Sequence, residues 1–186
     1  MTGSVAFWVA MALPIFWSMG AYNRLIRLRA LAIDAFSAID DQFKRHIELV
    51  KTGFAQPDAT SVPPANESDP NQVVALLAGL RGAAEQFDAC LKMVRTQPLA
   101  APAMGALQTA HQTLHAAWAR VQNQAHDLAG SRLPEPLPAR WNQLSASADI
   151  ACAEFNRRVE AYNDAITQFP AVMLAWLFGF SPAKSL

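Results

Sequence analysis

Helical periodicity is the feature that most constrains how this 186-residue chain can fold. Beyond residue 23, apolar residues recur at steps of three and four in four long segments, and none of these segments alternates with a period of two over more than a few residues. Positions spaced in this way share one face of an α-helix. The expected apolar faces run over residues 28–54, 73–94, 107–128 and 141–169. The pattern therefore predicts an all-α fold.

The lengths of these segments and the breaks between them predict how they are arranged. Residues 22–54 and 137–169 each predict a helix of 33 residues, about 50 Å long. The two middle segments predict helices about 40 Å long. A loop with four prolines and three acidic residues occupies residues 55–72. We expect residues 23–169 to form an antiparallel up-down four-helix bundle.

The amino terminus carries no charged side chain in its first 23 residues. Within Val5–Tyr22, 15 of 18 residues are apolar, and a helix needs roughly 17–25 such residues to cross a bilayer. Tryptophan and tyrosine rings favour the membrane interface, and proline is tolerated inside a lipid-embedded helix. The residues singled out here are Val5, Trp8, Pro14, Trp17 and Tyr22. The sequence predicts a transmembrane anchor over residues 1–22, continuous with the first bundle helix.

Two other interpretations of this apolar segment stay open. A cleaved signal peptide requires a positively charged region before its apolar run, and here only the α-amino group supplies such a charge. A buried core helix of a globular protein requires a partner helix that is apolar on all sides, and no later segment has that composition.

Three arginines, Arg24, Arg27 and Arg29, follow the apolar segment immediately, and no basic side chain precedes it. Because positive charge is retained on the cytoplasmic side of a membrane, most of the chain is expected on the cytoplasmic side of the cell (inner) membrane. The same three arginines are expected to form a basic collar that contacts anionic lipid headgroups.

Residues 170–186 contain a further apolar run after the last predicted helix. An even number of antiparallel helices returns the chain to the level of Tyr22, so this tail is expected beside the start of the bundle. Large aromatic side chains would expose much apolar area unless they cover the bundle end or enter the membrane interface. The residues expected at that interface are Trp176, Phe178 and Phe180.

Two stretches of the chain carry recognisable motifs. The first, from Ala21 to Arg45, reads AYNRLIRLRALAIDAFSAIDDQFKR, with Tyr-Asn-Arg-Leu and an aromatic-Ser-x-Ile-Asp element. The second, from Phe155 to Ala183, reads FNRRVEAYNDAITQFPAVMLAWLFGFSPA, with Tyr-Asn, Phe-Pro and Phe-Gly-Phe-x-Pro elements. In order, in spacing and in the preceding hydrophobic segment, these stretches resemble the LemA family.

The resemblance implies a membrane-anchored antiparallel helical bundle with no established enzymatic activity and no agreed catalytic residues. It also implies a role in organising membranes or membrane proteins. After Arg45 the family usually continues with an Asp-Leu-Ile-Pro-Asn-Leu-like stretch, whereas this chain has HIELVKTGFAQP. If that region carries an interaction in the family, the resemblance implies that this chain has lost or altered it.

The candidate metal ligands and nucleophiles favour structural roles. His111 and His115 have the spacing of two metal ligands on one helical turn, but no third ligand is identified, and His111 falls on an apolar face. Cys90 and Cys152 lie on or beside core faces of two different helices, where a free thiol behaves as a small apolar group. Neither cysteine has an identifiable base nearby in the pattern.

Four carboxylates suggest a second candidate cluster, namely Asp34, Asp40, Asp41 and Glu48. Di-metal helical bundles combine inward-facing Glu residues with Glu-x-x-His motifs, and no such motif occurs in this chain. Asp40 and Asp41 lie off the apolar stripe, so a solvated helix face is expected. The sequence therefore predicts no catalytic residue, no metal and no cofactor.

Composition narrows the classes of partner. Fifteen Lys and Arg residues balance fifteen Asp and Glu residues, and the pI is about 6.9, so no basic surface for nucleic acid is expected. No small-molecule substrate is evident. The function expected is a non-enzymatic, membrane-anchored LemA-like scaffold that recruits a protein partner or further copies of itself at the lipid bilayer. The alternative is an adaptor or sensor domain at the cytoplasmic face that regulates a membrane protease or a signalling kinase.

Overall fold

The computed structural model describes the backbone of residues 2–54, 70–127 and 136–186, with side chains from Phe16 onward except at a few helix ends. Within these ranges the chain forms five α-helices and no β-strand. The helices are α1 (Thr2–Gly53), α2 (Pro70–Thr96), α3 (Ala101–Asp127), α4 (Leu137–Thr167) and α5 (Ala171–Phe178). The prediction of an all-α fold is confirmed. Most of the expected loop 55–72 lies outside the described residues.

Proline positions explain several helix boundaries. Helix α2 ends at Thr96, two residues before Pro98, and α4 has a proline in its first turn, where the missing N–H costs nothing. The last long helix was predicted to continue to Phe169 but ends at Thr167, because Gln168 adopts an extended backbone with ψ of 142°. Pro170 has no backbone N–H to donate to the carbonyl four residues earlier, so this helix cannot continue through it. Helix α5, beyond that proline, was not predicted.

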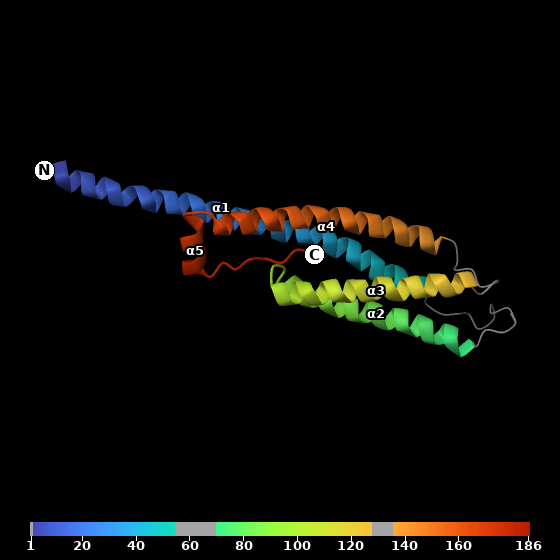
Figure 1. Cartoon of the computed structure of the whole chain (residues 1–186). Helices are drawn as coiled ribbons and strands as arrows, with labels where there is room; N and C mark the ends of the chain where they lie inside the picture. Colours follow the sequence, from blue (N-terminus) through green and yellow to red (C-terminus); the bar gives the residue numbers. More distant parts are fainter. Residues whose placement is uncertain (1, 55–69, 128–135) are drawn as a thin grey trace.

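The long helices pack in two pairs, α1 with α4 and α2 with α3 (Figure 1). Along the first pair, Trp17 lies against Phe169, Phe36 against Phe155, and His46 near Ser145. Residue numbers rise along α1 while they fall along α4, so these two helices run in opposite directions. The predicted neighbourhood of Phe155 and Phe36 is confirmed, with ring centroids 6.0 Å apart. The packing is compatible with a helical bundle.

Aromatic side chains join the two helix pairs. The carboxy-terminal half of α1 runs toward α2 and α3 (Figure 1), and there Phe43 packs against Phe87 with ring centroids 4.9 Å apart. Each buried side chain of this size contributes roughly 1.5–3 kcal/mol relative to an exposed one. The largest fully buried apolar residues are Leu25, Ile39, Phe43, Leu80, Phe87, Leu91, Met104, Leu107, Leu114, Phe155 and Tyr162. These residues form one core that involves all four long helices.

Asp40 does not lie on a solvated face, contrary to the sequence prediction. It is only 9% exposed, and its carboxylate accepts a hydrogen bond from Arg95 Nε at 2.6 Å and pairs with Lys44 at 2.6 Å. The prediction is wrong for Asp40 because the edge of the apolar stripe on α1 faces α2, from which Arg95 reaches across. Its neighbour Asp41 is exposed as expected.

The prediction of a single-pass membrane protein is also wrong. Among the residues that the structure describes, no helix is both long enough and apolar enough to cross a membrane. Helix α5 has eight residues, or about 12 Å, against a hydrocarbon core of about 30 Å. The expected location in the cell (inner) membrane is corrected accordingly.

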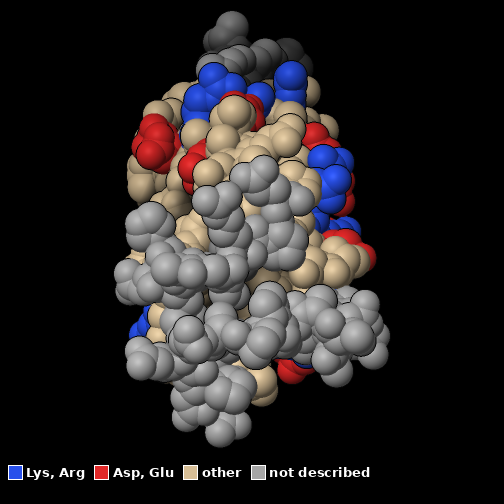
Figure 2. Space-filling view, turned by 90° about the vertical axis from the view of Figure 1, so that its right-hand side faces the viewer, with Lys and Arg blue, Asp and Glu red and all other residues tan. Residues whose placement is uncertain are grey.

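Charged side chains of both signs are interspersed on the face shown in Figure 2. Among the described residues, Lys92 pairs with Asp88 at 2.9 Å, and Glu154 accepts hydrogen bonds from Arg157 and Arg158. Such exposed pairs contribute little stability, typically under about 1 kcal/mol each. These pairs balance positive and negative charge locally and do not create a patch of one sign.

Candidate interaction surface

Helix α5 packs against the rest of the molecule with its smallest side chains. Only Ala171 and Ala175 are buried in this helix, whereas Trp176 is 85% exposed. A surface helix normally turns its large apolar residues inward and its polar residues outward. Since α5 reverses this arrangement and contains no polar residue, its outer face is the most unusual surface among the described residues.

The exposed face of α5 continues onto neighbouring segments. Trp17 contacts Phe169 edge-on at 5.3 Å between ring centroids, and Met19 lies one helical turn from both Phe16 and Tyr22 on α1. We call this area the apolar end surface, and its members are Phe16, Trp17, Met19, Phe169, Val172, Met173, Trp176, Leu177 and Phe178. They make up nine of the fourteen exposed large apolar residues of the described chain. A patch of this size on a monomer usually marks an interaction site.

A cavity of about 430 Å³ opens into the apolar end surface. One wall comes from Phe16, Trp17 and Gly20 of α1, and the other comes from Phe169 and Pro170. A Cβ atom added at Gly20 would meet nothing within 4 Å. The cavity therefore offers room for an apolar side chain from a partner.

Arg24 forms the polar rim of this cavity. Its Nη1 donates a hydrogen bond to Gln168 Oε1 at 3.5 Å. The other two members of the predicted collar, Arg27 and Arg29, are exposed on α1. The collar thus lies beside the apolar end surface rather than within it.

Helix α5 is held in place at its carboxy end. Gly179 has φ of 69°, a left-handed conformation that glycine adopts without strain. The turn lets the Phe180 N–H donate to the Ala175 carbonyl at 2.9 Å. The rings of Phe178 and Phe180 then pack on Tyr22 of α1, at centroid distances of 5.0 and 6.2 Å.

The last six residues form a strap along α4, which we define as residues 181–186. Asn163 donates to the Ala183 carbonyl and accepts from the Ala183 N–H, both at 2.9 Å. Asn156, two helical turns earlier, makes the same pair of bonds with Leu186 at 2.8 and 2.9 Å. Tyr162 adds a bond from its hydroxyl to the Ser181 carbonyl at 3.1 Å. These bonds fix the tail, so α5 is presented in one orientation.

The structure brings together part of the predicted site. Tyr22, Phe178 and Phe180 meet at the junction of α1 and the tail, and Trp17 lies on the edge of that surface. Trp176 is 85% exposed, so the expectation that its side chain shields the bundle end is not met. The side chains of Val5, Trp8 and Pro14 lie outside those described. The expected contact of the tail with a membrane interface stays a prediction.

A cluster of three imidazoles lies inside the helix packing, and sequence reasoning identified only two of them. The Nε2 atoms of His111 and His115 are 3.0 Å apart, and the ring of His46 from α1 lies 6.1 Å from that of His115. His46 is 1% exposed, and it contacts Gln42 and Ser145 through its two ring nitrogens. The sequence could have indicated the burial of His46, because it lies four residues after Gln42 and three after Phe43, on the inner face of α1.

Burial sets the protonation of this cluster. Loss of solvent, with a smaller contribution from the nearby charge of His115, lowers the pKa of His46 to about 4. Burial followed by the charges of His115 and His46 lowers the pKa of His111 to about 4, and burial also lowers the pKa of His115. The three rings are therefore neutral near pH 7. No group of three His, Cys, Asp or Glu residues in the described part of the chain has an arrangement suited to a metal ion.

Both cysteines are free and half-buried. Burial, together with a smaller contribution from the charge of Asp149, raises the pKa of the Cys152 thiol to about 11. The thiolate, which is the reactive form, is therefore disfavoured at Cys152 near pH 7. This agrees with a packing role for that residue.

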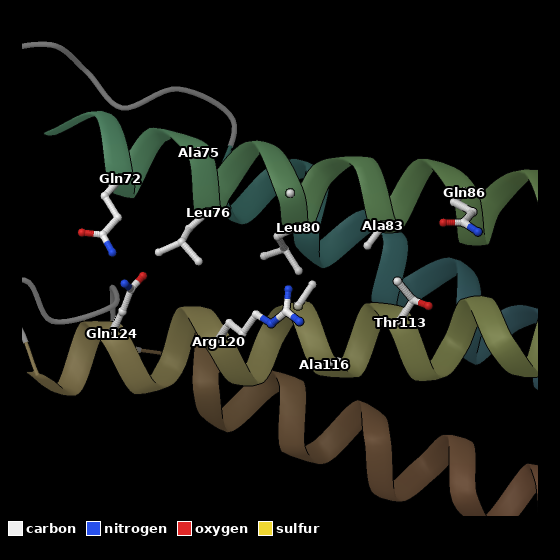
Figure 3. A pocket seen from close by; sticks show the side chains of 12 residues that line it. Gln72, Ala75, Leu76, Leu80, Ala83, Gln86, Thr113, Ala116, Arg120 and Gln124 are labelled. Atoms are coloured by element: carbon white, nitrogen blue, oxygen red, sulfur yellow. The ribbon is translucent and has the colours of Figure 1, made fainter. Parts of the chain in front are cut away.

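A second concave feature is a groove of about 650 Å³ between α2 and α3. Its floor consists of small or apolar residues such as Gly79, Leu80 and Ala83, and Arg120 extends from α3 across it (Figure 3). Gln72 and Gln124 face each other at its end. The groove is open and mostly apolar, with one cationic group.

Comparison of the chain with models of known protein families, with curated proteins and with solved structures finds no match in any of the three. The resemblance to the LemA family therefore stays a prediction from the two quoted stretches.

Proposed function

We propose that this chain is a non-enzymatic helical scaffold that binds a protein partner through the apolar end surface. The observation that carries the proposal is the reversed packing of α5, in which alanines face inward and Trp176 faces outward. Trp is enriched among the residues that dominate binding energies, and Trp, Phe and Met are enriched in the cores of protein interfaces. The strap keeps α5 ordered before binding, which lowers the entropy cost of forming a complex.

We further infer that α1 to α4 form a LemA-like antiparallel up-down four-helix bundle. The family resemblance supports this inference in one physical respect. The stretches that carry it contain Tyr22, Phe155 and Asn163, which are residues that attach α5, the strap and α4 to the rest of the molecule. The motifs thus coincide with the contacts that build the proposed surface.

The second candidate function is an adaptor or sensor domain that regulates a protease or a kinase. The groove between α2 and α3 is the observation that favours it, because a groove of about 650 Å³ can accept side chains of a bound segment. Arg120 would then select an acidic residue in that segment.

Affinity capture distinguishes the two candidate functions. Three variants of the full chain are crosslinked to their partners in the native host, and the captured partners are compared. Met173→Glu/Trp176→Glu places charge on the apolar end surface, Ala116→Glu places it in the groove, and Ile150→Glu alters a 74% exposed residue on α4 as a control. The scaffold proposal expects partners to be lost with the first variant alone. Loss with Ala116→Glu alone favours the adaptor, and identical partner sets for all three contradict both.

A further inference from the structure

We propose that the occupant of the apolar end surface is a second copy of this chain, an inference that rests on the proposed function. The two copies would meet through α5 and the adjoining turn of α1 around Trp17. Each copy would cover the exposed face of the other, so the contact would be isologous.

The exposed area is the first argument. A fully buried aromatic side chain covers about 150–250 Å², and the apolar end surface contains five aromatic and four aliphatic or thioether residues with exposures of 45% to 85%. From these exposed fractions and side-chain sizes, the apolar end surface exposes on the order of 1,000 Å². A stable interface buries about 800 Å² on each partner, so this single surface suffices for a dimer.

The absence of charge is the second argument. Residues 1–23 and 165–183 contain no Asp, Glu, Lys or Arg. A surface that meets its own copy across a two-fold axis places like groups opposite each other, which is unfavourable when they are charged and favourable when they are apolar. Arg24 lies at the rim of the cavity, where solvent and salt screen its repulsion from the second copy.

The shape of the end of the molecule is the third argument. Helix α1 continues beyond the ends of α4 and α5, and no other helix of the described chain accompanies it there (Figure 1). Each molecule therefore offers an unaccompanied stretch of helix beside an uncovered α5. A two-fold axis near Phe16 can lay this stretch of one copy along α5 of the other, which is the helix-in-groove mode of recognition. The 430 Å³ cavity beside Trp17 then receives a side chain of the second copy.

The oligomeric state of the full chain without detergent tests the inference. Light scattering coupled to gel filtration, over about 1 to about 100 µM, is expected to give twice the chain mass of 20.2 kDa. Met173→Glu/Trp176→Glu is expected to weaken the dimer by at least ~100-fold, with an unchanged circular dichroism spectrum. The control Ile150→Glu is expected to remain dimeric. A dimer that survives the double substitution would overturn the inference.

Photocrosslinking in a mixture of isotope-labelled and unlabelled chains tests the geometry of the contact. A benzophenone side chain at Leu177, which is 66% exposed, is expected to crosslink to residues 2–19 of α1. With one copy labelled by ¹⁵N and the other unlabelled, these crosslinks are expected to join heavy and light peptides. Crosslinks found only within one isotope would mean that α5 contacts its own chain, and the inference would fail.

The outcomes also separate this inference from the proposed function. If the chain is monomeric throughout the series while partner capture still depends on Trp176, the scaffold proposal stands and the second copy is excluded. If the chain is monomeric and Trp176-dependent sedimentation occurs with vesicles of phosphatidylglycerol and phosphatidylcholine, the surface binds lipid and both proposals fail. If substitution at Trp176 changes nothing in any assay, both proposals fail as well.

Discussion

Three imidazole rings enclosed by aromatic side chains show how single residues control the stability of this molecule. His46 donates from Nδ1 to the Gln42 carbonyl at 3.2 Å, which leaves Nε2 to accept from the Ser145 hydroxyl at 3.3 Å. Trp141 contacts the rings of both His46 and His115 at about 5 Å. Burial lowers the pKa of His46 more than the hydrogen bond to Gln42 raises it, so the neutral imidazole is favoured and protonation opposes the packing.

We predict that the free energy of unfolding falls as the pH falls from about 6.5 to about 4. The pKa values of His46 and His111 lie near 4 in the folded chain but near 6.5 in an unfolded one. In that window the unfolded state binds more protons, so acid favours unfolding, and stability is complete above pH 6.5. The loss at pH 4.5 is on the order of 2 kcal/mol for each ring.

Urea unfolding at pH 7.5 and pH 4.5 measures this effect. His46→Gln cannot titrate and keeps polar groups near Gln42 and Ser145, so its stability is expected to depend less on pH than that of the wild type. The other groups near His46 are His115 and Asp149, and both are unchanged in the variant. Equal pH dependence in the two proteins would contradict the prediction.

Asp40 and Asp41 make a second comparison at the scale of single residues. Asp40→Ala is expected to cost about 1–3 kcal/mol, because it leaves Arg95, itself partly covered at the α1–α2 contact, without its 2.6 Å partner. Asp41→Ala is expected to cost under about 0.5 kcal/mol, since its contact with Lys44 is exposed. Thermal unfolding of the two variants under the same buffer checks the difference. Equal shifts would mean that the pair with Arg95 is not formed.

At the scale of elements, the strap and α5 act as one unit. Asn156 and Asn163 use their side-chain amides as a peptide group would, each giving one donor and one acceptor to the strap. The strap then holds the turn at Gly179, and the turn positions Phe178 against Tyr22. The order of α5 therefore depends on two asparagines of α4.

We predict that Asn163→Ala releases the strap while the four long helices stay folded. The substitution removes two hydrogen bonds to Ala183, each worth about 1 kcal/mol. Amide hydrogen exchange of residues 179–186 is expected to accelerate at least tenfold, and exchange in α2 and α3 is expected to stay unchanged. Asn142→Ala, at an exposed position of α4, is the matched control and should leave the strap protected.

At the scale of the whole molecule, the contact between α1 and α4 connects the amino-terminal and carboxy-terminal thirds of the chain. Phe155 is fully buried and packs edge-on against Phe36. Because a large-to-small substitution here leaves a cavity, Phe155→Ala is expected to cost about 3–5 kcal/mol. Ile150→Ala, on the same helix but 74% exposed, is expected to cost under about 1 kcal/mol. Chemical denaturation of both variants checks this, and similar midpoints would show that the inner face of α4 is assigned wrongly.

Particular residues show how far sequence reasoning reaches. The spacing that places Phe43, Phe87 and Leu114 on inner faces depends only on the local helix period, and all three are buried. The burial of Asp40 could not be predicted, because its partner Arg95 is 55 residues away. His46 was missed for a similar reason, since the rings that surround it come from α3 and α4.

For the amino-terminal segment and the tail, the apolar composition was recognised, but what covers the segment and how the tail folds were not predicted. An uncharged composition was interpreted as an environment of lipid, although composition alone does not say what covers an apolar face. In the same way, the run after Pro170 was recognised as apolar, but its fold into α5 with alanines inward was not predicted. The orientation of that helix depends on Tyr22 and on the two asparagines of α4.

The sequence by itself therefore determined the helical class, the approximate ends of the long helices and most of their inner faces, because these follow from interactions within a few residues. Only the tertiary structure decided that three histidines meet, that Asp40 is covered and that Trp176 stands exposed. Those features depend on which helices become neighbours, and neighbours distant along the chain leave no periodic trace in the pattern of residues.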